Sequence, residues 1–396
     1  MNTNQDISQA GRISEQEEEI YPDGVEAEDI GINQPFNPSE IRVETQQMSL
    51  DTLIKRIREN EIDLSPNFQR NEVWKPLAKS RLIESLLIRI PLPAFYMDAT
   101  NEDRWVVIDG LQRLSTLRDF IIGKTENGST EYMTLSGLEF LNELEGKLFS
   151  ELQRNFQRRI EETQVTVYKI EKGTPPEVKF NIFRRINTGG LPLSSQEIRH
   201  ALNQGAVVQL LKEMAESNEF RQAVNNGVKE KERMADRECA LRVLAFLRTR
   251  PEQYDDKVKD FDAFLSDAMA DLNGLTDQER DQLKGRFFRA MRIARALFDR
   301  KAFRKQSKRS TYGYPINKSL LESWSVNLDA LTEAQVQSLT ERKEQLRERF
   351  LDIMEERDFD DAVTQGTGSK ARVQLRFRRI KEIIQEVLNA NPSDAA

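Results

Sequence analysis

Residues 105–114 read Trp-Val-Val-Ile-Asp-Gly-Leu-Gln-Arg-Leu, and this run changes from strand-like to helix-like around a single Asp-Gly step. Four apolar residues, mostly β-branched or aromatic, run straight into Asp109 and Gly110, which is typical of a buried strand that ends in a tight turn. A helix-like stretch follows from Leu114 to Phe120. The segment therefore predicts a strand, a turn and the N-terminus of a helix.

This arrangement suits a phosphate group. A helix N-terminus offers unpaired N–H groups and a partial positive charge. Gly110 lets the backbone approach a ligand closely, and Arg113 supplies a planar, permanently charged fork for phosphate oxygens. An ordinary strand-turn-helix with one surface arginine explains the same residues, so this short motif alone does not decide between the two interpretations.

Two further segments flank the motif in the sequence. Upstream, residues 67–74 read Asn-Phe-Gln-Arg-Asn-Glu-Val-Trp, followed by an apolar helical pattern at 82–87 and by Ile-Pro-Leu-Pro at 90–93. Downstream, residues 183–194 read Phe-Arg-Arg-Ile-Asn-Thr-Gly-Gly-Leu-Pro-Leu-Ser, followed by Gln-Glu-Ile-Arg at 196–199. The order of all three segments is much more specific than any one of them.

Together these segments resemble the N-terminal domain of GmrSD-type restriction proteins, over about residues 46–204. That family is related to the ParB and sulfiredoxin fold, and its hallmark is Asp-Gly-Gln-Gln-Arg. This chain has Asp-Gly-Leu-Gln-Arg, with Leu111 in place of the first glutamine. The resemblance implies nucleotide binding with hydrolysis attached to the motif, and Leu111 removes one polar group from that pattern.

The resemblance also implies roles for individual residues. Catalytic roles fall on Asp109, Gln112 and Arg113, because phosphoryl transfer needs a carboxylate-held metal, an oriented water and an arginine. Asp109 would hold Mg²⁺, which is usually bound by one or two carboxylates together with phosphates; a turn or cap residue is the alternative. The nucleotide (an NTP) would contact a larger set, in which glycine N–H groups and neutral side chains bind anions: Gln69, Arg70, Gly110, Asn187, Thr188, Gly189 and Gly190.

Hydrophobic periodicity places the remaining elements. Helices are expected at 49–59 and 76–89, and strands at 94–97 and 164–170. Capping boxes at Thr174–Glu177 and Ser194–Glu197 predict two helix starts. From residue 206 onward almost only helical periodicity is present. We therefore expect an α+β, ParB/sulfiredoxin-like domain at 46–204 followed by an all-α domain at 205–396, within the 396 residues of the chain.

Residues 1–45 form an acidic leader. It carries eleven acidic residues and two arginines, a net charge of −9, so that the rest of the chain is about +2 of the total −7. The leader lacks helical periodicity, and a segment of this composition is expected to be disordered. It would act as a solubilising tail or, alternatively, as an electrostatic inhibitor of a basic surface.

Composition excludes several classes of protein. No apolar run approaches the length of a membrane span, and the N-terminus is not a signal peptide. One cysteine, Cys239, excludes an internal disulfide and favours a cytoplasmic setting. Cys239 and the single histidine, His200, cannot supply a zinc site or a His-metal nuclease site. GmrSD proteins typically carry a His-Asn-His nuclease domain, so any cleavage here must come from the first domain or from a partner.

A basic stripe lies at residues 286–309. If this segment forms a helix docked by its apolar face, the stripe has the electrostatic character of a DNA-binding surface; a solvated face paired with nearby acids is the equal alternative. A smaller basic cluster at 372–381 has the same ambiguity. The residues chosen as DNA-binding are Arg286, Arg289, Arg292, Arg295, Arg304 and Lys305.

Two functions remain open at this stage. The first is a nucleotide-dependent, DNA-directed enzyme of restriction and phage defence, an NTPase and Mg²⁺-dependent DNA endonuclease. The second is a non-catalytic nucleotide sensor that binds DNA and acts through a partner nuclease or defence protein. Fold resemblance does not choose between them, because function depends on the site.

Overall fold

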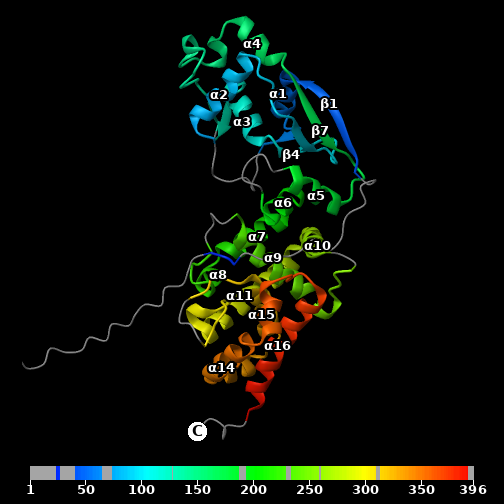
Figure 1. Ribbon diagram of the computed structural model, residues 1–396, viewed down its shortest axis with the longest axis vertical. Coiled ribbons are helices and arrows are strands. Elements are labelled where there is room, and N and C mark those ends of the chain that lie inside the picture. Colours follow the sequence, from blue (N-terminus) through cyan, green and yellow to red (C-terminus); the bar gives the residue numbers. More distant parts are fainter. Residues whose placement is uncertain are drawn as a thin grey trace, which may run out of the picture.

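The computed structural model gives the positions of most of the chain (Figure 1). It describes residues 24–26, 41–64, 74–126, 128–186, 193–228, 233–257, 260–308 and 313–390. The N-terminal part is a mixed sheet with helices and the rest is helical, so the predicted α+β class with a helical remainder is confirmed. No helix within the described ranges is long and apolar enough to span a membrane.

The N-terminal part is built on a five-stranded sheet with the strand order β1-β7-β3-β4-β2. The antiparallel pairs are β1 with β7 and β3 with β4, and the parallel pairs are β3 with β7 and β2 with β4. A small hairpin, β5 and β6, stands apart from this sheet. The strands are β1 (Val43–Ser49), β2 (Ile62–Asp63), β3 (Phe95–Asp98), β4 (Trp105–Asp109), β5 (Lys124–Glu126), β6 (Ser129–Glu131) and β7 (Gln164–Ile170).

Helices pack against both faces of the sheet. Alternate residues of β3, β4 and β7, such as Phe95, Val107 and Val167, form one core with the four helices α1 to α4. Ile108 and Ile170 point to the other face and form a second core with α5 and α6. The helices are α1 (Leu50–Arg58), α2 (Pro76–Leu87), α3 (Leu111–Ile121), α4 (Arg154–Glu161), α5 (Pro176–Ile186) and α6 (Ser195–Leu202).

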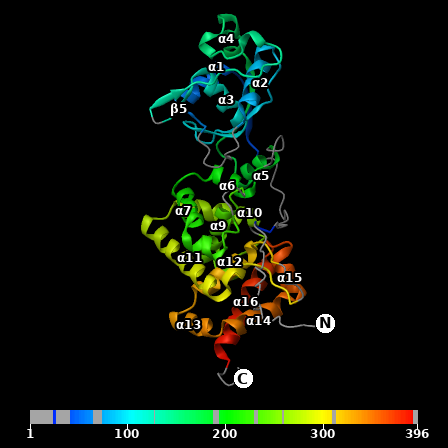
Figure 2. The same ribbon diagram turned by 90° about the vertical axis from the view of Figure 1, so that its left-hand side faces the viewer.

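The helical part has its own large core, centred on α9, α11, α12 and α16. Figures 1 and 2 both show α5 and α6 between the sheet and these helices. The elements are α7 (Ala206–Glu216), α8 (Asn218–Ala223), α9 (Ala235–Arg248), α10 (Phe261–Asn273), α11 (Asp277–Phe298), α12 (Lys318–Asp329), α13 (Glu333–Glu341), α14 (Lys343–Met354), α15 (Arg357–Thr364) and α16 (Lys370–Asn389).

Local signals located the element boundaries well. Ser49 caps α1 by accepting a hydrogen bond from the Thr52 N–H, and Ser194 and Glu197 form the expected capping box of α6. The prediction of a disordered leader needs correction at two places. Residues 43–45 belong to β1, and residues 24–26 bond to the helical part. Both gain order from distant partners, β7 and Ile316, which a local pattern cannot reveal.

Candidate functional site

The predicted strand-turn-helix is present, with β4 leading through Gly110 into α3. Gly110 has a φ of 98°, in the left-handed region that favours glycine. A Cβ at this position would lie 2.4 Å from Cδ1 of Phe95, far inside contact distance. The turn therefore requires glycine for two reasons, its backbone conformation and its close approach to β3.

The Arg113 side chain turns inward and clamps this turn to the start of β3. Its guanidinium donates to the carbonyl oxygens of Pro93 and Ala94 and to Asp109 Oδ2, the last at 2.8 Å. It also lies over the ring of Phe95, 4.6 Å from the centroid. The side chain is only 10% exposed. Arg113 thus holds the site together and is not the surface arginine of the alternative interpretation.

Asp109 is the accessible member of the ion pair, with a side chain 36% exposed. Burial lowers the pKa of the Arg113 guanidinium, and the neighbouring Asp109 carboxylate opposes that shift. Burial also raises the pKa of Tyr96, with Tyr168 and Asp109 adding to the effect. The tyrosine rings stack at 4.8 Å, and Tyr96 pairs with Asp109 across the sheet. Sequence reasoning did not select these tyrosines, because their link to Asp109 comes from strand pairing.

The N-terminus of α3 has no side-chain cap. The first N–H groups of such a helix are free of intrahelical partners and can bind an anion. Leu111 and Arg113 are buried, whereas Gln112 is partly exposed. Gln112 Oε1 accepts a hydrogen bond of 3.3 Å from the Trp74 N–H. Gln112 therefore ties the end of the upstream motif segment to the turn.

Six predicted nucleotide-binding residues, namely Gln69, Arg70, Asn187, Thr188, Gly189 and Gly190, lie outside the described residues. The residues that border them are described. Trp74 follows the upstream segment and bonds to Gln112. Ile186 and Leu193 border the downstream segment, and both pack against the core that contains Ile108. The structure therefore brings the borders of both segments to the part of the sheet that carries the turn.

Comparison with protein families gives a match to the GmrSD restriction endonuclease, N-terminal domain, over residues 50–203. Residues 50–203 match this family model, and we call them the GmrSD-type domain. The resemblance predicted from the three motif segments is confirmed over these residues. No curated protein matches the sequence.

The described residues contain no cluster of protein ligands that could hold a metal ion by itself. In the described parts of the chain, no group of three or more His, Cys, Asp or Glu residues is arranged to hold a metal ion. Asp109 offers one carboxylate, shared with Arg113. This fits Mg²⁺ bound largely by phosphates and water, and does not fit a site made of protein ligands alone.

His200 and Cys239 lie in the protein interior, at 1% and 0% exposure. Burial, together with the positive charge of Arg237, lowers the pKa of His200 to about 4, so the imidazole is neutral at pH 7. Burial raises the pKa of the Cys239 thiol, which makes it a poor nucleophile. Both side chains are therefore part of the packed interior.

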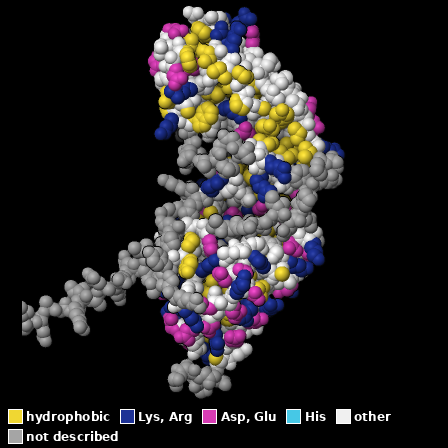
Figure 3. Space-filling view, viewed as in Figure 1, with side chains coloured by type: hydrophobic (Ala, Val, Ile, Leu, Met, Phe, Trp, Pro, Cys, Tyr) yellow, Lys and Arg dark blue, Asp and Glu magenta, His cyan; other side chains and the backbone are white. Residues whose placement is uncertain are grey.

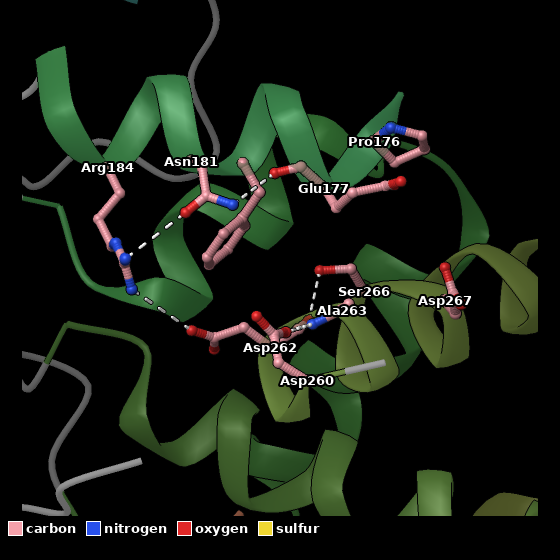
Figure 4. A pocket seen from close by; sticks show the side chains of 10 residues that line it. Pro176, Glu177, Asn181, Arg184, Asp260, Asp262, Ala263, Ser266 and Asp267 are labelled. Atoms are coloured by element: carbon pink, nitrogen blue, oxygen red, sulfur yellow. Dashed lines mark hydrogen bonds and ion pairs between the residues drawn. The ribbon is translucent and has the colours of Figure 1, made fainter. Parts of the chain in front are cut away.

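A small hollow, open to solvent, lies between α5 of the GmrSD-type domain and α10 of the helical part (Figure 4). Its side chains include Arg184, Asp260 and Asp262, and none of its residues belongs to the Asp109–Arg113 turn. Asp262 points toward Arg184 and also binds Arg199 at 2.7 Å. Two of its charged groups, Arg184 and Asp262, therefore already contact each other across the two parts.

The predicted DNA-binding cations all have contacts within the protein. Arg286 pairs with Asp329, Arg289 with Glu333, Arg292 with Glu219 and Arg295 with Asp299. This is the paired face that sequence analysis kept as the alternative. Arg286 and Arg292 keep exposed side chains, at 45% and 59%.

The last two predicted cations are buried. Arg304 is 1% exposed and donates to the carbonyl oxygens of Tyr314 and Val224. Lys305 has a side chain 10% exposed and pairs with Glu26 and Asp360. In this conformation neither offers its charge to a DNA phosphate, because neighbouring segments cover both side chains.

Proposed function

We propose that this chain is a nucleotide-dependent, DNA-directed protein of restriction and phage defence, which binds an NTP at the Asp109–Arg113 turn. The observation that carries the proposal is the GmrSD-type domain match together with the position of the Asp-Gly-Leu-Gln-Arg turn. That turn lies at an uncapped helix N-terminus, with the borders of both other motif segments beside it. A mixed sheet covered by helices on both faces supports the proposed ParB/sulfiredoxin-like fold.

The ion pair at the turn suggests how the nucleotide binds. Two carbonyl oxygens and the ring of Phe95 hold Arg113 in place, and its guanidinium also donates to Asp109. In the proposed complex a phosphate oxygen takes over this contact, which frees the Asp109 carboxylate for Mg²⁺. The metal ion would supply charge neutralisation at the phosphates. Arg113 then binds and orients the phosphate, and Gln112 orients water or holds the Trp74 segment beside it.

The second candidate is a sensor that binds nucleotide without hydrolysing it and acts through a partner nuclease or defence protein. One observation favours it. Leu111 occupies the position of the first glutamine of the family motif, is 4% exposed and packs in the core beneath the turn. That position offers an apolar side chain to the core and no polar group to a water molecule, so hydrolysis would depend on Gln112 and Asp109 alone.

Thermal shift and phosphate release with each NTP, with and without Mg²⁺, test the proposal. An NTP at about 100 times its Kd should stabilise the fold by roughly 2.7 kcal/mol. Asp109→Asn should retain most of this stabilisation and lose hydrolysis. Arg113→Lys keeps the charge and loses the planar fork, so it should bind the NTP at least tenfold more weakly.

Asp103→Asn is the matched control, because Asp103 is an exposed acid outside the turn. It should behave like the wild type in both assays. Equal NTP stabilisation of wild type, Asp109→Asn and Arg113→Lys would contradict the proposed site. Binding without phosphate release in the wild type would favour the sensor.

DNA binding is a separate part of the proposal. Its described candidates are the exposed Arg286 and Arg292, with the partly exposed Arg289 and Arg295. If about five phosphate contacts form, log K should fall against log salt with a slope near −4.5. The double variant Arg286→Glu with Arg292→Glu should make that slope less steep, by the equivalent of about two phosphate contacts. An unchanged slope would place the DNA surface elsewhere on the protein or on its partner.

A further inference from the structure

Residues 24–26 form a short extended segment against the helical part, beside α8 (Figure 1). The Gly24 N–H donates to the carbonyl oxygen of Gly227 at 2.6 Å, and the Ile316 N–H donates to Gly24 at 3.0 Å. The Glu26 N–H donates to the Ile316 carbonyl oxygen at 2.8 Å, which completes a parallel bridge between Val25 and Ile316. A piece of the acidic leader is thus paired with a backbone edge almost 300 positions away in the sequence.

Side chains of the helical part bind the Glu26 carboxylate. Lys305 Nζ lies 2.9 Å from one oxygen, and Asn317 Nδ2 donates to the other at 2.8 Å. Asn317 is fully buried, and it also donates to the Val363 carbonyl oxygen. Val25 packs against the large helical core. The helical part therefore binds both the apolar side chain of Val25 and the carboxylate that follows it.

The backbone edge at Ile316 and Asn317, to which the leader segment binds, is held by contacts within the helical part. Ile316 pairs with Arg304 in an antiparallel bridge, and the Asn317 N–H donates to the Phe303 carbonyl oxygen at 2.9 Å. The buried Arg304 guanidinium reaches the Tyr314 and Val224 carbonyl oxygens. These contacts do not depend on the leader. The N–H and carbonyl groups of Ile316 therefore stay in position to bind an added strand. Such an edge is the structural basis of peptide recognition by strand addition.

We propose that this edge is a peptide-docking slot, defined by Gly227, Lys305, Ile316 and Asn317, for an extended segment with a β-branched residue followed by a carboxylate. Its occupant is the leader segment Gly24–Glu26 of the same chain. Few contacts hold the segment. It stays bound because the chain links it covalently to the rest of the protein, which gives an effective concentration on the order of 1 mM. A free peptide of the same sequence enters the slot once the leader is displaced.

The test uses the full chain and a fluorescent peptide of residues 20–30. In the Val25→Asp chain, the tethered segment carries a charge in place of its apolar side chain and vacates the slot. The peptide should bind this variant at least tenfold more tightly than wild type, because about 10 µM peptide competes poorly with a tethered segment near 1 mM. Adding Lys305→Met to Val25→Asp should weaken peptide binding at least fivefold.

Two controls separate recognition from simple charge attraction. A peptide with residues 25 and 26 exchanged has the same composition and charge, and it should not bind. Lys301→Met removes one exposed positive charge outside the slot and should leave peptide binding unchanged. Circular dichroism checks that each variant is folded. Equal binding of both peptides, or no binding to folded Val25→Asp, would overturn the proposal and make the segment a covalently held tail only.

Discussion

The Asp109–Arg113 turn of the GmrSD-type domain and the interior of the helical part use charged side chains differently. In the GmrSD-type domain, the Asp109–Arg113 ion pair lies where β4 ends, and its carboxylate, Asp109, is partly open to solvent. In the helical part, charged groups run through the interior. Figure 3 shows a related difference on one face of the surface, where hydrophobic side chains gather on the upper domain while both charges mix over the lower helices.

The buried charges form a connected network. Arg199 of α6 binds Asp262 at 2.7 Å and lies 3.9 Å from Glu238 of α9. Glu238 accepts from Arg242 at 2.8 Å and from Lys318 at 3.0 Å. Arg242 lies 3.7 Å from Glu322, which pairs with Arg376 of α16. Although burial would raise the pKa of Glu238, the cations Lys318, Arg242 and Arg199 lower it well below its usual range.

This difference suggests a division of labour. Burying charges is costly, so a buried network persists only where each charge is paired, and breaking one pair is strongly destabilising. Such a network fixes the packing of α6, α9, α10, α12 and α16 relative to one another. At the turn, Arg113 is held by carbonyl oxygens while the Asp109 carboxylate is partly open to solvent, so an exchange of the carboxylate's partner costs less there. The helical part would therefore act as a rigid base for an adaptable site.

The largest predicted effect tests the buried network directly. Glu322→Ala removes a fully buried carboxylate between Arg242 and Arg376, so that the buried Arg376 loses its carboxylate partner while Arg242 keeps Glu238. We expect a loss of about 3–5 kcal/mol in the free energy of unfolding, measured by urea denaturation. The matched control is Glu333→Ala, which breaks the exposed pair with Arg289. It should cost less than about 1 kcal/mol, and equal costs would contradict the comparison.

The next effect concerns the turn in the GmrSD-type domain. Gly110→Ala places a Cβ against Phe95 at a φ of 98°, so it should destabilise the fold by about 2–3 kcal/mol. Gly146→Ala is the control, because Gly146 has a positive φ of 74° but no atom within 4 Å of an added Cβ. Gly110→Ala should cost more than Gly146→Ala in thermal denaturation. An equal loss of stability in both variants would show that the contact with Phe95 does not exclude a side chain at residue 110.

A third effect follows from the pKa of His200, which is lowered from 6.5 to about 4. The unfolded chain binds a proton that the folded chain excludes, so stability falls as pH drops from about 6.5 toward 4. The contribution is about 2 kcal/mol at pH 5 relative to pH 7.5. The loss of stability between these pH values should be about 2 kcal/mol smaller in His200→Gln than in wild type, by urea denaturation. The same loss of stability in both proteins would show that His200 does not cause the pH dependence.

The smallest predicted effect concerns the exposed cations. Arg292→Ala breaks a pair at 3.3 Å with Glu219, in which the arginine side chain is 59% exposed. The free energy of unfolding should change by less than about 0.5 kcal/mol. A loss above about 1 kcal/mol would mean that the exposed pairs of α11 resemble the buried network, and would weaken the comparison.

Some of the site could be read from the sequence because its signals are local. The change from β-branched residues to a helical pattern at Asp109-Gly110 located β4 and α3, and the cap of α6 at Ser194 depends on residues only three positions apart. Arg113 was correctly placed at the turn. Its inward direction was not predicted, since its partners Pro93 and Ala94 precede it by about twenty residues and meet it only through the pairing of β3 with β4.

The sequence by itself determined the strand-turn-helix at Asp109-Gly110, the neighbouring elements α1, α2, β3 and β7, and the family match of residues 50–203, because each depends on nearby residues or on motif order. Only the tertiary structure decided which charges are buried. Glu238 and Arg242 stand one helical turn apart and suggest a local pair. Their ion pairs with Arg199 and Glu322 join segments that are distant in the sequence and that only the packing of the core brings together. The same is true of the ion pair between Glu26 and Lys305.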